Sequence, residues 1–150
     1  MPPIDVARSL ENLKLERDAV LLYDELSRIE GDPGRAEAFR TIAATERRHA
    51  EIWANRLREL GANVPPPDPR PRPRVRVILL LARLFGTHAV SGLVLALEGD
   101  ESAIYEAQDH PEVASIAAEE EANAEIWRKL DRERRTAAAA ATIRAARANG

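Results

Sequence analysis

IAATERRHAEIW, residues 42–53, returns later in the chain as IAAEEEANAEIW, residues 116–127. Eight of the twelve positions are identical, and the two stretches are offset by 74 residues. Residues three, four and seven positions apart lie on one face of an α-helix, so the repeat predicts two related helices with similar residues on one face. The pairs that carry the comparison are Glu46 with Glu120, Trp53 with Trp127, and His49 with Asn123.

The composition favours one helical domain. The chain has 150 residues, enough for a sizeable core, and only 4% of them are aromatic, whereas Ala, Glu, Arg and Leu are abundant. The net charge of −3 argues against a dedicated binder of nucleic acid or of anionic membranes. The absence of cysteine excludes disulfides, thiolate zinc sites, cysteine-ligated iron–sulfur centres and cysteine nucleophiles.

The first residues lack the basic and apolar regions of a signal peptide. The most apolar run, residues 77–84, is too short to span a bilayer and contains Arg83. A chain without cysteine is compatible with a reducing compartment, so we expect a cytoplasmic location, on the cytosolic face of a membrane if a longer protein carries this domain.

Helical periodicity and stop signals predict four helical regions. The Asp32-Pro33 pair is a good start signal, and Gly86-Thr87 is expected to kink or break the third region. Six of the ten prolines lie between residues 65 and 73, which predicts an extended crossover over residues 62–75. Two hairpins joined by a crossover make an all-α four-helix bundle. The expected helices span residues 5–30, 33–60, 75–108 and 111–148.

A second, weaker repeat links the first and third helical regions. LERDAVLLY, residues 15–23, corresponds to LEGDESAIY, residues 97–105, at an offset of 82. On each helix a Glu therefore faces the same side as residues of the predicted core. Several carboxylates and one imidazole in a bundle core repel one another unless protons or metal ions lie between them. The set is Glu16, Glu46, His49, Glu98, Glu101 and Glu120.

A Glu from each of two helices, with Glu-x-x-His on the other two, is the pattern of di-iron and di-manganese carboxylate bundles. Oxygen and imidazole ligands suit these metals, and the absence of cysteine disfavours soft-metal sites. The pattern predicts two metal ions per site, iron or manganese. It departs from the rule at one place, because Asn123 replaces the second histidine.

From about Leu10 to Leu130 the chain resembles the rubrerythrin branch of the ferritin-like superfamily. The resemblance implies a single ferritin-like domain over residues 1–150 and metal ligands at six of seven matching positions, with a tyrosine near the metals on the first and third helices. The residues that match are Glu16 with Tyr23, Glu46 with His49, Glu98 and Glu101 with Tyr105, and Glu120, followed by Asn123 in place of the family's histidine.

The connector and the segment LARLFG, residues 81–86, are similar to the ferritin-like domain fused ahead of membrane transporters of the vacuolar iron transporter family. This likeness implies a role in iron transport. It predicts that residues 132–150 form a helical extension leading towards a membrane domain that is absent from this chain.

Plainer readings stay open for several residues. Glu46 with His49 is also compatible with a surface pair, Glu101 with a solvated position in an acidic run, and the tyrosines with a packed core. The tryptophans are expected to be packing residues, and Glu119 and Glu121 to be surface charges. The arginines of residues 70–76 are expected to belong to a solvated linker, with contact to nucleic acid or anionic lipid as the alternative. His88 and His110 are not in register with the site.

An amide oxygen is a weaker ligand than an imidazole, so Asn123 predicts two unequal metal positions. The tighter one is expected from Glu16, Glu46 and His49, and the looser one from Glu98, Glu101 and Glu120, with Glu46 and Glu120 able to bridge. The preferred function is oxidation of Fe(II) by oxygen or peroxide; the alternative is a non-enzymatic metal sensor or dimerisation module. An alanine-rich last helix and a long crossover favour a homodimer.

Overall fold

The computed structural model describes residues 6–106 and 111–149, with the side chains of residues 101–106 and 111–112 left undescribed. It is all-α in this part of the chain, which confirms the predicted fold class. The helices are α1 (Val6–Ile29), α2 (Pro33–Glu59), α3 (Pro73–Phe85), the short 3-10 helix η1 (Thr87–Val90), α4 (Ser91–Glu106) and α5 (Pro111–Ala148).

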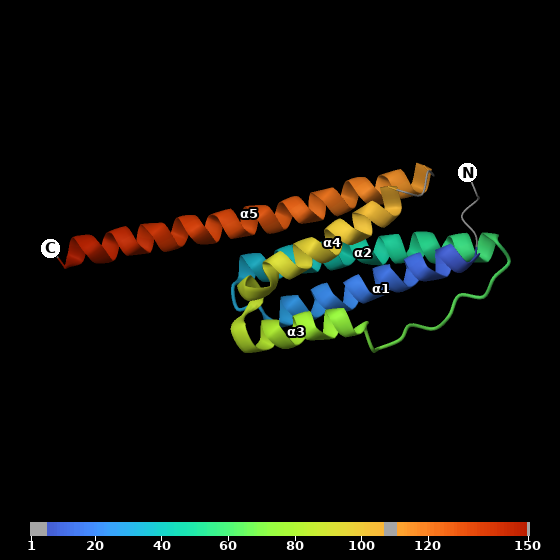
Figure 1. Ribbon diagram of the computed structural model, residues 1–150, viewed down its shortest axis with the longest axis horizontal. Helices are drawn as coiled ribbons and strands as arrows, with labels where there is room; N and C mark the ends of the chain where they lie inside the picture. Colours follow the sequence, from blue (N-terminus) through green and yellow to red (C-terminus); the bar gives the residue numbers. More distant parts are fainter. Residues whose placement is uncertain (1–5, 107–110, 150) are drawn as a thin grey trace.

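The bundle consists of α1, α2, α4 and α5 (Figure 1). The α1–α2 turn follows the predicted start signal: Asp32 caps α2 by accepting a hydrogen bond from the backbone N–H of Arg35 at 2.8 Å, and Pro33 opens the helix. After α2 the chain turns at Gly61, whose φ of 74° is readily adopted only by glycine.

The proline-rich segment returns along the outside of the bundle and leads into α3, which packs against α1 (Figure 1). Two contacts hold it to α1. Arg17 donates a hydrogen bond to the carbonyl of Pro65 at 2.8 Å, and the Arg72 guanidinium pairs with the buried carboxylate of Asp18 at 2.5 Å. The crossover is therefore a fixed part of the structure, made of an extended stretch and a helix.

The third helical region is divided, and its two parts run in opposite directions (Figure 1). α3 ends at Gly86, which has a φ of 88°, and η1 reverses the chain into α4. The predicted kink or break at this glycine is confirmed, but α3 and α4 were expected to form one wall of the bundle together. Only α4 fills that place, because a residue with positive φ cannot continue a right-handed helix.

The core has a buried polar layer between two apolar clusters. Along α2, Phe39, Ile42 and Ala43 belong to one cluster and Trp53 to the other, with Glu46 and His49 between them. Along α5, Ile116 precedes the layer and Trp127 follows it. The Trp53 cluster contains Leu13, Trp53, Ala54, Leu57, Val113 and Ile116; the Tyr23 cluster contains Leu22, Tyr23, Leu26, Phe39, Ile42, Ala43, Val75, Ile78, Leu79, Ala82, Val90, Val94, Leu97 and Trp127.

The second half of α5 runs beyond the bundle (Figure 1), and residues 132–149 are exposed throughout. Among the described residues, no helix combines the length and the apolar character needed to cross a membrane.

Candidate metal centre

Four side chains from three helices converge in the polar layer. Glu16 comes from α1, Glu46 and His49 from α2, and Glu120 from α5, and each is at most 2% exposed. One carboxylate oxygen of each Glu and one ring nitrogen of His49 all lie within 4.8 Å of one another. This grouping follows from helical spacing, since each residue lies between apolar residues that turn the same helix face inward.

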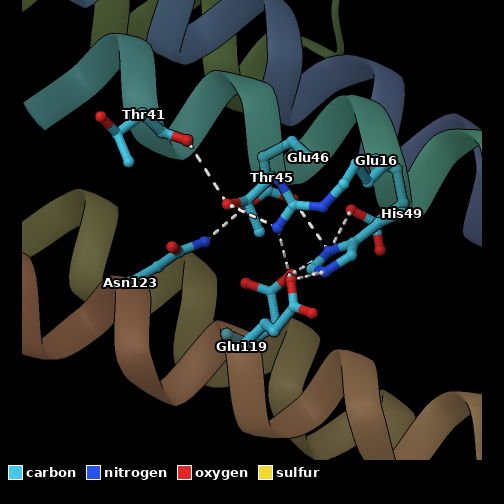
Figure 2. A network of polar contacts seen from close by, with 9 residues as sticks. Glu16, Thr41, Thr45, Glu46, His49, Glu119 and Asn123 are labelled. Atoms are coloured by element: carbon cyan, nitrogen blue, oxygen red, sulfur yellow. Dashed lines mark hydrogen bonds and ion pairs between the residues drawn. The ribbon is translucent and has the colours of Figure 1, made fainter. Parts of the chain in front are cut away.

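The imidazole of His49 is at the centre of this group (Figure 2). Its Nδ1 lies 3.5 Å from Glu16 Oε2, 3.5 Å from Glu46 Oε2 and 3.4 Å from Glu120 Oε1. The three carboxylates thus point at the same ring nitrogen from three directions. Such an arrangement is electrostatically costly unless a proton or a cation lies among them.

Three of the converging atoms lack a hydrogen-bond partner within the described part of the chain. They are Glu46 Oε2, Glu120 Oε1 and His49 Nδ1, all inaccessible to solvent. Buried polar atoms are nearly always satisfied, so orphaned atoms that converge on one point are the geometry expected of a ligand site. Two carboxylate oxygens and an imidazole nitrogen are donors that suit iron and manganese, so the residues fit the metal that the sequence pattern predicts.

Proton affinities in the cluster are strongly changed. Burial lowers the pKa of His49, but interactions with Glu120, Glu16 and Glu46 outweigh it and raise this pKa to about 12. Burial raises the pKa of Glu46 well above its usual value, although His49 opposes the change, and burial raises that of Glu120 in the same way. These shifts favour the protonated forms of His49, Glu46 and Glu120, so a metal ion bound here would compete with protons.

Asn123 also reaches the cluster, from one turn further along α5. Its side chain is 3% exposed, and its Nδ2 donates a hydrogen bond to Glu46 Oε1 at 2.6 Å (Figure 2). One oxygen of Glu46 is thus held by Asn123, while the other faces His49. In this arrangement the amide orients a carboxylate, and its nitrogen rather than its oxygen faces the cluster.

Glu119 is a contact that sequence analysis missed. Its Oε2 lies 2.9 Å from His49 Nε2 and 3.2 Å from the Arg48 guanidinium, at the edge of the polar layer (Figure 2). The side chain is 39% exposed, as expected of a surface charge, but it also contacts the buried imidazole of His49. Three consecutive glutamates at residues 119–121 hid it, because only the position matching Glu46 stood out in the repeat. When a carboxylate accepts a hydrogen bond from Nε2–H of a neutral imidazole, Nδ1 carries no proton and can bind a metal.

The remaining predicted ligands are placed differently. Glu98 on α4 is buried, with 4% of its surface exposed. It is not one of the four described residues whose ligand atoms converge. The backbone of Glu101 and Tyr105 belongs to α4, but their side chains lie outside the described residues. His88 is half-buried in η1 and away from the group, and His110 lies outside the described residues.

Tyr23 lies in the apolar cluster named after it. Its hydroxyl accepts a hydrogen bond from Trp127 Nε1 at 3.0 Å, and its ring packs against Phe39 and Trp127. Trp127 and Trp53 are fully buried in different clusters, on opposite sides of the polar layer. The two tryptophans therefore exclude water from both sides of the cluster.

The fold and the site define a ferritin-like helical bundle whose core holds a carboxylate–histidine group able to bind metal. The chain belongs to the Rubrerythrin family, whose model matches residues 10–132. This is a family of di-iron carboxylate proteins, so the family and the geometry agree on a metal-binding core. No curated protein and no solved structure matched the chain significantly.

Proposed function

We propose that this protein binds iron in its core and oxidises Fe(II) with oxygen or peroxide. The observation that supports this most strongly is the convergence of Glu46 Oε2, Glu120 Oε1 and His49 Nδ1, three buried atoms without hydrogen-bond partners among the described residues. A bound iron pair would supply the electrons and a Lewis-acid centre for reduction of the oxidant.

In this proposal Glu16, Glu46, Glu120 and Nδ1 of His49 hold the metal. Glu119 accepts the Nε2 proton of His49 and so keeps its Nδ1 available, and Asn123 fixes the orientation of Glu46. Glu98, with Glu101, supplies the second and looser position. Iron is preferred, and manganese is the alternative metal.

The carboxylates also handle protons. Two Fe(II) ions give up one electron each, and reduction of one peroxide to two waters consumes two protons. Burial raises the pKa values of Glu46 and Glu120, so metal binding at these carboxylates would compete with protons. With no cysteine in the chain, electrons come from Fe(II) itself or from a partner protein.

Anaerobic titration with Fe(II), followed by addition of oxygen or peroxide, tests the proposal. We expect two ions per chain, bound with different affinities, and formation of Fe(III) faster than in protein-free buffer. A control titration of Glu16→Ala, which removes a ligand from the tighter position, should show both binding and oxidation reduced. Absence of any binding would contradict every metal-dependent function for this chain.

A metal sensor is the second candidate, and it is supported by the exposed extension of α5 at residues 132–149, which is free to contact another protein or domain. Tight binding of Fe(II) without oxidation would favour it. The same extension supports two finer proposals, a homodimer and a link to an iron transporter. Light scattering of the chain with and without residues 132–150 would test the first, and copurification with a transporter the second.

A further inference from the structure

α3 carries apolar residues on two opposite faces. Its inner face packs in the Tyr23 cluster through Val75, Ile78, Leu79 and Ala82. The outer face also carries apolar residues, spaced three and four positions apart along the helix. These residues, here called the outer stripe, are Val77 and Leu80, each 54% exposed, and Leu84, 64% exposed; Phe85, 70% exposed, follows at the end of the helix.

Arginines flank the outer stripe, and α3 contains no acidic residue. Arg76 and Arg83 follow one edge of the stripe, and Arg74 lies near the other. Arg83 pairs with Glu25 at 3.2 Å and Arg74 with Asp100 at 2.9 Å, both on the surface, where such pairs contribute little and exchange readily. Arg76 makes no ion pair among the described residues.

A groove of about 620 Å³ runs beside this stripe, between α3 and the proline-rich segment. Its walls combine apolar surface with the two arginines of the near edge and with Glu25, which pairs with Arg83. The residues that matter here are Leu21, Pro69, Pro71, Arg76, Leu80 and Arg83.

We propose that α3 docks this protein onto the surface of an anionic lipid bilayer. A helix that lies in the membrane interface has large apolar residues on one side and Lys or Arg beside them, which is the arrangement of the outer stripe. With 13 residues α3 is too short to span a bilayer, so it lies on the surface. The net charge of −3 predicted no affinity for such membranes, but every charged residue of α3 itself is an arginine.

The arginines beside the outer stripe favour a lipid surface over a second copy of the chain as the partner of α3. If two copies paired stripe to stripe, Arg76 and Arg83 of one copy would face the same arginines of the other. Like charges brought together in this way destabilise an interface. Anionic phosphate headgroups attract the same arginines, and the apolar stripe then enters the boundary with the acyl chains.

Flotation of the metal-free chain of 150 residues with vesicles tests the docking. We expect binding to vesicles of phosphatidylglycerol and phosphatidylcholine, and much weaker binding to phosphatidylcholine alone or at high salt. The double variant Leu80→Asp/Leu84→Asp should bind at least about tenfold more weakly, and Arg76→Gln a few-fold more weakly, since each arginine near the surface adds affinity. Ile143→Asp on the exposed part of α5 is the matched control and should bind like the wild type.

Circular dichroism and light scattering of each variant accompany the flotation. Retained helicity, unchanged mass and lost vesicle binding of the double variant support the proposal. Equal binding of all variants, or no binding by the wild type, would overturn it. A wild-type mass that falls by half in the double variant would also overturn it, because the stripe would then be buried between two copies.

Discussion

The two related segments, residues 42–53 of α2 and residues 116–127 of α5, bury the same face but use it differently. Each presents a buried Glu at its fifth position, Glu46 or Glu120, and both carboxylates reach the His49 ring. At the next inward position His49 faces three carboxylates, whereas Asn123 donates a hydrogen bond to one of them. In the proposed metal centre, one half of the repeat offers an additional ligand, His49, and the other half orients Glu46, a ligand from the first half.

At the last position of the repeat both segments have a tryptophan, but the two tryptophans lie in different apolar clusters. Trp53 lies in a cluster with Leu13 and Leu57, whereas Trp127 bonds Tyr23 in the other cluster. Because α2 and α5 run in opposite directions (Figure 1), equal positions end on opposite sides of the polar layer. The two related segments therefore place similar residues in different surroundings on either side of the buried polar layer.

The largest effect is expected from removing the carboxylate that both halves depend on. Glu46→Ala deletes an oxygen that faces His49 and the acceptor of the Asn123 amide. We expect the affinity for Fe(II) to fall at least about a hundredfold, measured by anaerobic titration, because even an outer-shell contact is worth 10–100-fold. Glu51→Ala, exposed on the same helix, serves as the control and should be neutral. Unchanged stoichiometry in Glu46→Ala would refute its role in binding.

Making the two halves alike sharpens the comparison. His49→Asn places in α2 the residue that α5 already has, and it removes the only ring nitrogen in the four-residue group. We expect the tighter of the two Fe(II) affinities to fall about tenfold to a hundredfold while the protein stays folded. The same titration gives the result; two affinities equal to those of the wild type would show that His49 is not a ligand.

Stability against pH tests the electrostatics of the first half. Since the pKa of His49 is about 12 in the folded chain and about 6.5 when unfolded, the folded state alone keeps this proton between pH 7 and 9. The metal-free protein should therefore lose about 1.4 kcal/mol of unfolding free energy per pH unit in that window. Denaturant unfolding in the presence of a chelator measures the slope. His49→Asn should flatten it, and an equally steep slope in that variant would assign it to other groups.

The reverse exchange gives a smaller effect. Asn123→His restores the ligand type that α5 lacks, and we expect the weaker Fe(II) affinity to rise up to about tenfold. Asn123→Asp, a variant of similar size, should instead weaken the metal-free fold, because it sets a carboxylate against Glu46 Oε1. If Asn123→His leaves the isotherm unchanged, this position orients Glu46 and does not bind metal.

The smallest effect is expected from a substitution in the Tyr23 cluster. Tyr23→Phe removes the acceptor for the buried Trp127 indole N–H, which should cost about 1 kcal/mol of unfolding free energy. Metal affinity should stay within twofold if Tyr23 acts through packing alone. A larger change in Fe(II) oxidation would bring Tyr23 back as a group that serves the metal centre.

Much of this fold follows from the sequence because helical spacing, caps and the repeat agree. The Asp32-Pro33 start, the break at Gly86 and the proline-rich crossover were all readable from local residues. The reversal at η1 was not, since a glycine with positive φ fixes where a helix ends but not where the chain goes next. The position of α3 against α1 depends on long-range packing that no short pattern contains.

The site shows the same division. Helical spacing brought Glu16, Glu46, His49 and Glu120 to one layer, as the repeat suggested. The role of Asn123 as a donor to Glu46 and the contact of Glu119 with His49 depend on side-chain geometry between α2 and α5. Sequence spacing within one helix carries no information about such contacts between helices.

Anomalous scattering at the iron and manganese edges, from crystals grown with Fe(II) without oxygen, tests the central claim most directly. We expect a strong iron peak among Glu16, Glu46, Glu120 and His49 Nδ1, and a second, weaker peak on the side of Glu98. Two peaks of equal strength would contradict the difference between the halves of the repeat. The absence of any peak in the polar layer would contradict the metal centre itself.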